Sequence, residues 1–196
     1  MKKQLIAALL GFVCITSMAN SSEMKQATFA GGCFWCMEHA FDEVEGVTET
    51  VSGYTGGHKT TPNYKEVSAG TTGHTEAVQV SYDPNKVSYK TLLDVFWRNI
   101  DPTMDHGQFC DYGNQYRPEI FYHNEAQRKQ AEISKQELKK NKTFPQEIKV
   151  KITQESRFYP AEDYHQDYHH KNPLRYKMYR YGCGRDQRLE TLWGKK

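Results

Sequence analysis

The chain has 196 residues, of which 26 are basic, 24 are acidic and 37% are hydrophobic. This size and composition predict one ordinary globular domain. A formal net charge of +2 lacks the basic excess that a phosphate-binding surface needs, so we expect no nucleic acid partner. The mean hydropathy of −0.83 excludes a bundle of membrane helices. Five cysteines are too few to build a disulfide scaffold in a chain of this length, and their odd number leaves at least one unpaired.

The first 19 residues have the pattern of a bacterial secretory signal peptide. Two lysines precede an apolar run from Leu5 to Ile15, and a Ser-Met-Ala site precedes Asn20. As a helix this run would be about 16 Å long, well short of the ~30 Å hydrocarbon layer, so we expect no stable membrane insertion. We expect removal of residues 1–19, with loss of Cys14, and an exported, periplasmic domain at residues 20–196. An uncleaved membrane anchor is the alternative.

Hydrophobic patterning in the first half of the domain predicts both strands and helices. Residues 26–30 are expected to form a strand that turns into a helix over residues 37–44. Residues 78–82 alternate between apolar and polar side chains and precede Asp-Pro, which predicts a half-buried strand. From Ser88 to Ile100 the apolar residues fall on one helical face, which we expect to lie in the core.

The second half continues this mixed α/β pattern. Asn124 is expected to cap a charged helix that runs to about residue 141, and residues 148–152 alternate as a strand. Segments rich in Gly, Pro and aromatic residues predict irregular structure, with a short helix only near residues 161–170. These segments are residues 53–57, residues 107–117 and the chain from Ser156 onward.

Cys33 and Cys36 form a Cys-x-x-Cys pair at the expected start of a helix. The free N–H groups and the dipole of a helix N-terminus favour a thiolate, so Cys33 is a candidate nucleophile. Two structural thiols and a zinc site are the alternatives. A zinc site would need a second pair such as Cys183 with His169, whereas Cys110 and Cys183 each stand alone in the sequence. We therefore expect no bound metal.

Other residues near these segments have the chemistry of a site but also ordinary explanations. Phe34 and Trp35, between the cysteines, could form a wall around a small apolar group or belong to the core. Glu76 lies near the start of a strand, and Asp111 and Tyr116 lie in a polar loop. On spacing alone, each of these polar residues could also be solvated.

Five blocks follow one another along the chain: GCFWC at 32–36, SGYTGG at 52–57, GHTEA at 73–77, QYR at 115–117 and YPAEDYHQ at 159–166. Together they closely resemble the A-type peptide methionine sulfoxide reductases, over roughly residues 26–194. Enzymes of this kind repair oxidised methionine. The resemblance implies reduction of methionine S-sulfoxide, free or in oxidised proteins and peptides, without a cofactor. It also implies a two-layer α+β domain with a central mixed sheet flanked by helices and wrapped by an irregular C-terminal segment.

The resemblance also implies roles for single residues. Cys33 would attack the sulfoxide sulfur, and Glu76 would be the acid that protonates the oxygen. Burial would have to raise the pKa of Glu76 from its ordinary value of ~4.3. Tyr54 and Tyr116 would donate hydrogen bonds to the sulfoxide oxygen, and Asp111 would position water or a tyrosine.

The substrate's S-methyl group would lie in a box made by Phe34, Trp35 and Tyr164. We expect the pocket to open to solvent, because a peptide has to enter it.

The resemblance implies a sulfenic acid at Cys33 that a second thiol captures as a disulfide. Many family members have Gly at position 36 and use cysteines near the C-terminus instead. The presence of Cys36 departs from that pattern, so we expect Cys36 to be the resolving cysteine. Cys183 is the alternative, the role of Cys110 is open, and a thioredoxin-like reductant would restore the thiols.

Two other functions are compatible with the Cys-x-x-Cys pair. The first is a thioredoxin-like thiol–disulfide oxidoreductase that uses Cys33 and Cys36. The second is a metal-binding module that uses the same two cysteines and two of the eight histidines.

Overall fold

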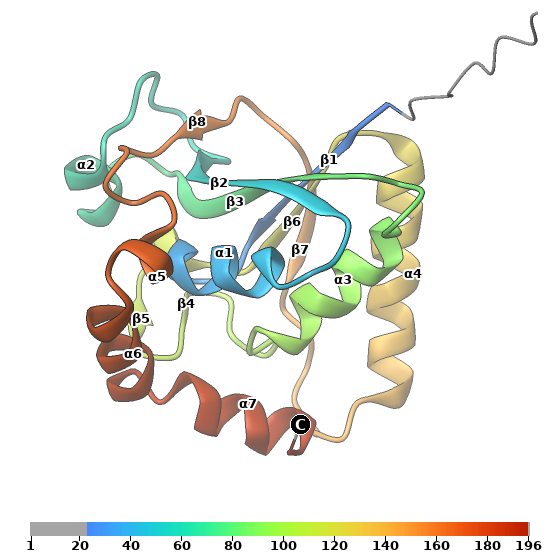
Figure 1. Ribbon diagram of the computed structural model, residues 1–196. Helices are drawn as coiled ribbons and strands as arrows, with labels where there is room; N and C mark the ends of the chain where they lie inside the picture. Colours follow the sequence, from blue (N-terminus) through green and yellow to red (C-terminus); the bar gives the residue numbers. More distant parts are fainter. Residues whose placement is uncertain (1–22, 196) are drawn as a thin grey trace, which may run out of the picture.

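A six-stranded sheet forms the centre of the protein, as the computed structural model of residues 23–195 shows (Figure 1). Its strands are β1 (Lys25–Ala30), β2 (Val47–Thr55), β3 (Thr75–Tyr82), β6 (Glu119–Tyr122), β7 (Lys151–Gln154) and β8 (Tyr159–Pro160). Their order is β7-β6-β1-β3-β2-β8. Strands β6 and β7 are parallel, whereas the other neighbours are antiparallel. The mixed sheet expected from the sequence is therefore confirmed.

Helices flank this sheet (Figure 1). They are α1 (Phe34–Asp42), α2 (Tyr64–Ser68), α3 (Tyr89–Arg98), α4 (Glu125–Asn141), α5 (Tyr168–Lys171), α6 (Pro173–Gly182) and α7 (Arg185–Trp193). A short hairpin of β4 (Gly107–Gln108) and β5 (Asp111–Tyr112) precedes the 3₁₀ turn η1 (Asn114–Tyr116). Within residues 23–195, the helices lack the combined length and apolar character that a membrane span requires.

Helix α3 forms as its sequence predicts. The Ser88 side chain accepts a hydrogen bond from the backbone N–H of Thr91 at 3.0 Å and so caps the helix. Leu92 and Phe96 on its apolar face are completely buried. Phe96 stacks on Phe29 of β1 with ring centroids 5.3 Å apart. This face therefore joins the helix to the central sheet.

Several boundaries differ from those expected. Helix α1 begins at Phe34, directly after the Cys33 turn, rather than at residue 37. Residues 53–55, expected to be irregular, are the end of β2. The first half of this strand is mostly polar, so its sequence lacks the alternation of apolar and polar residues that predicts a strand. Helix α4 does begin after its cap at Asn124, and β7 begins at Lys151.

The C-terminal segment wraps around the domain but is largely helical, which corrects the expectation of irregular structure (Figure 1). Helices α5 to α7 occupy most of residues 168–193, so the short helix expected near residues 161–170 starts only at Tyr168. Only Tyr176 is buried in α6. A helix without an apolar stripe lacks the periodicity on which its prediction depends.

A buried arginine anchors this segment to the rest of the fold. Arg185, the first residue of α7, is 1% exposed. Its Nη2 donates to the carbonyl oxygens of Gly31, at 3.1 Å, and Asn99, at 2.6 Å. The guanidinium also lies 4.4 Å from the ring centroid of Phe109. One side chain thus joins α7 to the β1–α1 turn and to the end of α3.

Replacing Arg185 with Met should lower the free energy of unfolding by on the order of 3 kcal/mol, because two buried carbonyls lose a charged donor. Urea unfolding would measure the change. The matched variant Arg175→Met, at an exposed position of α6, should stay within about 0.5 kcal/mol of the parent. Equal stability of the two variants would contradict the anchoring role of Arg185.

Candidate active site

The Cys33 thiol lies at the strand-to-helix turn, as expected. Cys33 is the residue before the first turn of α1, and the preceding Gly32 has φ +81°, in the left-handed region. A Cβ at Gly32 would lie 2.5 Å from the Cβ of Gln108, so this position requires glycine. Cys33 and Cys36 are 5% and 1% exposed, and both are free thiols.

The two thiols of the Cys-x-x-Cys pair differ in their affinity for a proton. Burial raises the pKa of Cys33 well above its ordinary value. A hydrogen bond from Cys33, together with the nearby Arg185 and Arg180 guanidinium groups, lowers the pKa of Cys36 to about 6. At neutral pH the pair therefore holds one proton between two sulfur atoms. Transfer of that proton from Cys33 to Cys36 makes Cys33 the thiolate.

Glu76 is a buried acid next to this pair. It lies on β3, is 2% exposed, and its Oε2 accepts a hydrogen bond from the backbone N–H of Phe34 at 3.0 Å. Burial raises its pKa well above the ordinary value, and the charge of Asp111 adds to this effect, whereas the Phe34 N–H opposes it. The raised pKa favours the protonated form of Glu76, which can donate a proton beside Cys33.

The hydroxyl of Tyr54 already has an acceptor. Tyr54 lies opposite Glu76 in the pairing of β2 with β3, and its hydroxyl donates to Glu162 Oε2 at 2.8 Å. The other Glu162 oxygen accepts from the backbone N–H of Tyr64, also at 2.8 Å. Because a hydroxyl has one proton, Tyr54 can donate a hydrogen bond to a substrate oxygen only after its hydrogen bond to Glu162 is broken.

Two further tyrosines are electrostatic neighbours of the acid and the thiol. Burial raises the pKa of Tyr116, and the charges of Glu76 and Cys33 contribute to the shift. The same causes raise the pKa of Tyr64 to about 12. Both hydroxyls therefore keep their protons and are available as donors. Tyr64 was not identified from the sequence.

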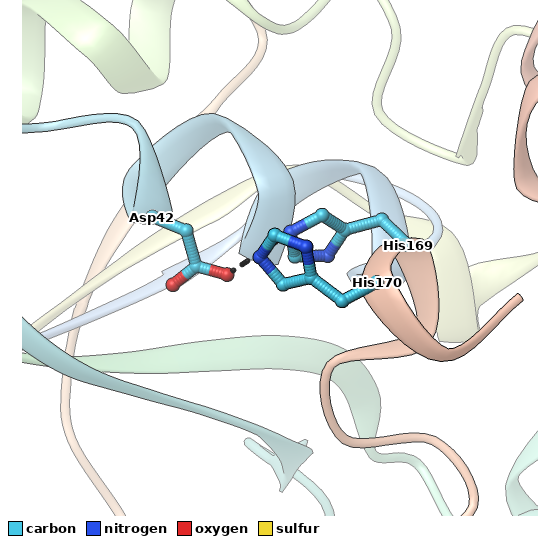
Figure 2. A group of neighbouring side chains, drawn as sticks. All are labelled: Asp42, His169 and His170. Carbon is cyan, nitrogen blue, oxygen red and sulfur yellow. Dashed lines mark ion pairs between the residues drawn. The ribbon is translucent and has the colours of Figure 1, made fainter. Parts of the chain in front are cut away.

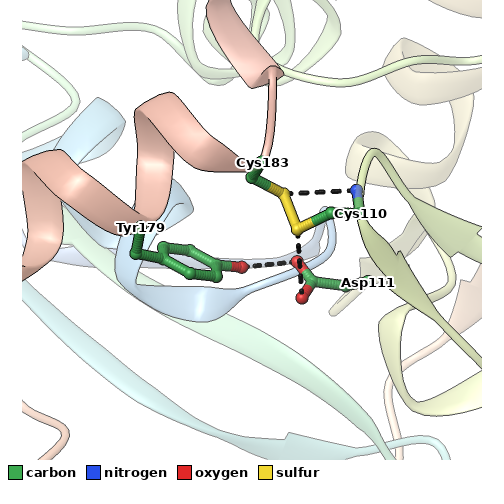
Figure 3. Close-up of a disulfide and its surroundings, with 4 residues drawn as sticks. All are labelled: Cys110, Asp111, Tyr179 and Cys183. Carbon is green, nitrogen blue, oxygen red and sulfur yellow. Dashed lines mark hydrogen bonds between the residues drawn. A yellow bond between two sulfur atoms is a disulfide. The ribbon is translucent and has the colours of Figure 1, made fainter.

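Asp111 holds a tyrosine that the sequence analysis missed (Figure 3). The Tyr179 hydroxyl, from α6, donates to Asp111 Oδ2 at 2.5 Å. The Tyr179 hydroxyl also lowers the pKa of Cys33, against the larger effect of burial; with one proton, it donates either to Asp111 or to the Cys33 sulfur. Asp111 thus acts on the thiol through Tyr179.

A disulfide joins Cys110 to Cys183 across 73 residues of sequence (Figure 3). Cys183 is therefore bonded to Cys110 in this structure, whereas the sequence offered it as an alternative resolving cysteine and as a zinc partner of His169. The backbone N–H of Cys110 contacts Cys183 Sγ at 3.2 Å, and Cys110 Sγ lies 3.8 Å from Asp111 Oδ1. The bond fixes the end of α6 beside the strand that carries Asp111.

The three residues expected to form the methyl box gather around His165. Phe34 is 1% exposed, with its ring centroid 4.9 Å from that of His165. Trp35 Nε1 donates to His165 Nδ1 at 3.1 Å, and its ring stacks on Tyr168 at 3.8 Å. Tyr164 is 59% exposed and lies 4.2 Å from His165. Burial lowers the pKa of His165 to about 4, so its neutral ring can accept from Trp35.

Several residues of this site had no role assigned from sequence. Glu162 and His165 belong to the YPAEDYHQ block, which marked the segment but not their contacts. Tyr179 lies in α6, outside any block. The expected open pocket is also corrected at the thiol, because Cys33 and Glu76 are almost completely buried.

The unequal thiols predict a two-step titration. Thiolate absorbance in the ultraviolet should rise first near pH 6, the pKa of Cys36, because Cys33 and the arginines stabilise that thiolate. In Cys36→Ser this first step should disappear, and Cys33 should titrate above its ordinary pKa as burial dictates. A single step at an ordinary thiol pKa in the parent protein would contradict the proton-sharing pair.

Comparisons with known proteins agree with one another. A family model described as peptide methionine sulfoxide reductase matches residues 25–196. The peptide methionine sulfoxide reductase MsrA of Bacillus licheniformis is 52% identical over 179 residues, which are 91% of this chain and 98% of that protein. MsrA 2 of Staphylococcus aureus is 48% identical over 87% of this chain and 96% of its own length.

Solved structures show the same similarity. Mxr1 of Saccharomyces cerevisiae in reduced form has a TM-score of 0.73 at 35% identity, covering 79% of this chain and 89% of that one. Methionine sulfoxide reductase A of Corynebacterium diphtheriae has a TM-score of 0.69 at 32% identity, covering 79% and 78%. Mxr1 in complex with Trx2 has a TM-score of 0.54 at 26% identity, covering 79% and 91%.

Proposed function

The chain belongs to the peptide methionine sulfoxide reductase family and reduces methionine sulfoxide with thiols, and we propose that Cys33 is the nucleophile of this reaction. One observation carries the assignment. Glu76 is buried, its pKa is raised, and it accepts a hydrogen bond from the N–H of Phe34, the residue directly after Cys33. A sulfoxide oxygen cannot leave as an oxide ion, so the attack on sulfur needs such an acid at its side.

In the first step the Cys33 thiolate attacks the sulfoxide sulfur while Glu76 gives a proton to the oxygen. The oxygen passes to Cys33 as a sulfenic acid, and methionine leaves with its sulfur reduced. Tyr116 donates a hydrogen bond to the oxygen as negative charge develops, and Tyr54 does so after release from Glu162. Asp111 orients Tyr179 toward the thiol.

The apolar rings determine the orientation of the substrate. Phe34 and Trp35, with Tyr164 at the rim, contact the S-methyl group and favour the S-epimer. Burial of one methyl contributes only about 0.8 kcal/mol, so these rings set orientation more than affinity. Free methionine sulfoxide and exposed methionine sulfoxide in oxidised proteins or peptides share this group.

Cys36 is the resolving cysteine. Cys36, which holds the proton received from Cys33, attacks the Cys33 sulfenic acid through its sulfur and gives this proton to the departing hydroxyl, so a disulfide forms and water leaves. Its lowered pKa supports this role, since a thiolate is the attacking species. Cys110 and Cys183 are already bonded to each other, which leaves Cys36 as the free thiol near Cys33.

A thioredoxin-like protein closes the cycle by reducing the Cys33–Cys36 disulfide with its own two thiols. The complex of yeast Mxr1 with Trx2 supports this choice of reductant. The alternative of a thioredoxin-like oxidoreductase is not favoured, because thiol–disulfide exchange has no need for the buried acid Glu76.

We also propose that the chain is exported. The signal pattern at residues 1–19 lies outside the described residues, so its support is the sequence together with the Cys110–Cys183 disulfide, a bond that persists in oxidising compartments. A mature protein whose N-terminal sequence still begins at Met1 would contradict cleavage before Asn20.

The two active-site thiols should fail in different ways. Cys33→Ser should give no methionine, even in a single turnover without reductant, because the nucleophile is lost. Cys36→Ser should give about one equivalent of methionine per chain and then stop, because the sulfenic acid is not resolved. Quantifying methionine after mixing with a sulfoxide peptide measures both. Continued turnover of Cys36→Ser with thioredoxin would contradict its resolving role.

Glu76→Gln should slow the chemical step by about 10²–10⁴-fold, as expected for loss of a general acid. In the parent, single-turnover rates should fall as pH rises through the raised pKa of Glu76, since only the protonated form acts. The Gln variant should lose that decline. The control is Glu38→Gln, because Glu38 is also fully buried and accepts a hydrogen bond from the Ser52 hydroxyl. This variant should retain most activity.

A further inference from the structure

We propose that Asp42, His169 and His170 form a binding site for a divalent transition-metal ion of the Zn²⁺ class, separate from the thiol centre (Figure 2). Asp42 is the last residue of α1, and the two histidines belong to α5. Figure 2 shows both imidazole rings turned toward the Asp42 carboxylate. Two imidazoles with one carboxylate are a ligand set that suits such metals.

The donor atoms are close enough to share an ion. One ligand atom from each residue lies within 4.8 Å of the others, and His169 Nε2 is 3.5 Å from Asp42 Oδ2. Donors around a tetrahedral zinc ion are about 3.3 Å apart, given Zn–N distances of ~2.0–2.1 Å. To share an ion with the other two ligands, the exposed His170 side chain has to move closer to them. Glu38 Oε2, 3.9 Å from His169 Nδ1, offers a carboxylate on the other side of the ring.

The buried imidazole lacks the partners that buried polar groups normally have. His169 is 6% exposed, yet neither ring nitrogen has a hydrogen-bond partner, and Asp42 Oδ2 also lacks one. The distance of 3.5 Å between His169 Nε2 and Asp42 Oδ2 is too long for a good hydrogen bond. A metal ion would satisfy both groups at once.

The cluster also has an entry route of suitable charge. Asp42 and His170 line a surface hollow of about 610 Å³. Glu49, Asp163 and Asp167 line it as well, and its described lining residues include no lysine or arginine. Lys171 Nζ lies 3.6 Å from Asp167 Oδ2 and offsets part of this negative charge. The remaining carboxylates attract cations toward half-buried Asp42 and exposed His170.

An ion held here would connect the helix that carries the active-site thiols to the C-terminal segment. Asp42 is at the opposite end of α1 from Cys33, and α5 leads directly into α6, which carries Tyr179. The proposal is independent of the reaction, because none of the three ligands contacts the thiols or Glu76.

The test is equilibrium dialysis of the full chain against Zn²⁺, with bound zinc quantified by metal analysis. His170→Gln removes an exposed ligand and leaves the buried packing intact. His106→Gln, an exposed histidine on the loop before β4, is the matched control. The parent and the His106→Gln control should each bind one more zinc ion per chain than His170→Gln. Where His170→Gln still binds this ion, its affinity should be about 10–100-fold weaker. Asp42→Asn should give the same loss.

Co²⁺ absorption identifies the ligands independently. Binding here should give a spectrum without a sulfur-to-metal charge-transfer band, and His170→Gln should abolish it. Failure of the parent to bind Zn²⁺ would overturn the proposal. So would equal binding by parent and His170→Gln, or a Co²⁺ spectrum dominated by thiolate, because the ion would then lie at Cys33 and Cys36.

Discussion

The buried guanidinium of Arg185 is the contact on which the site depends most. It donates to Gly31 in the turn before the thiols and to Asn99 after α3, so it fixes the relative positions of three segments. Its positive charge also contributes to the lowered pKa of Cys36. Without it, α7 would lose its anchor and the thiol pair would lose a source of stabilisation for its negative charge. Fold stability and thiol reactivity therefore share one side chain.

Burial raises the pKa of both Glu76 and Cys36, but the two groups differ in their other contacts. At Glu76 burial dominates, whereas at Cys36 a hydrogen bond from Cys33 and the nearby arginines lower the pKa to about 6 despite burial. A proton donor and a thiolate can thus coexist at one pH within a few residues of Cys33. In water, a free carboxyl and a free thiol have the reverse order of acidity. The site reverses this order because the two groups have different surroundings, which shift their pKa values in opposite directions, as in other acid–base sites.

The sequence was most informative where local pattern and structure coincide. The apolar face after Ser88 and the Glu76 block could be predicted because periodicity and motif are local properties. Tyr179 could not, because its contact with Asp111 joins residues 68 positions apart through a helix that lacks an apolar stripe. The pairing of Cys110 with Cys183 is likewise invisible in spacing, since nothing local selects a partner 73 residues away. The acceptor of Tyr54 was missed because Glu162 reaches it only once β8 pairs with β2.

The Cys110–Cys183 bond has a consequence for how electrons reach the enzyme. Cys110 is exposed, whereas Cys36 is 1% exposed. A reductant arriving from solvent therefore meets the bond that fixes Tyr179 before it meets the buried sulfur atoms of Cys33 and Cys36. Accessibility alone would direct reduction to the outer pair. In the proposed reaction, selectivity for the inner pair would depend on how the reductant docks, so the recognition surface and the catalytic cycle would be coupled.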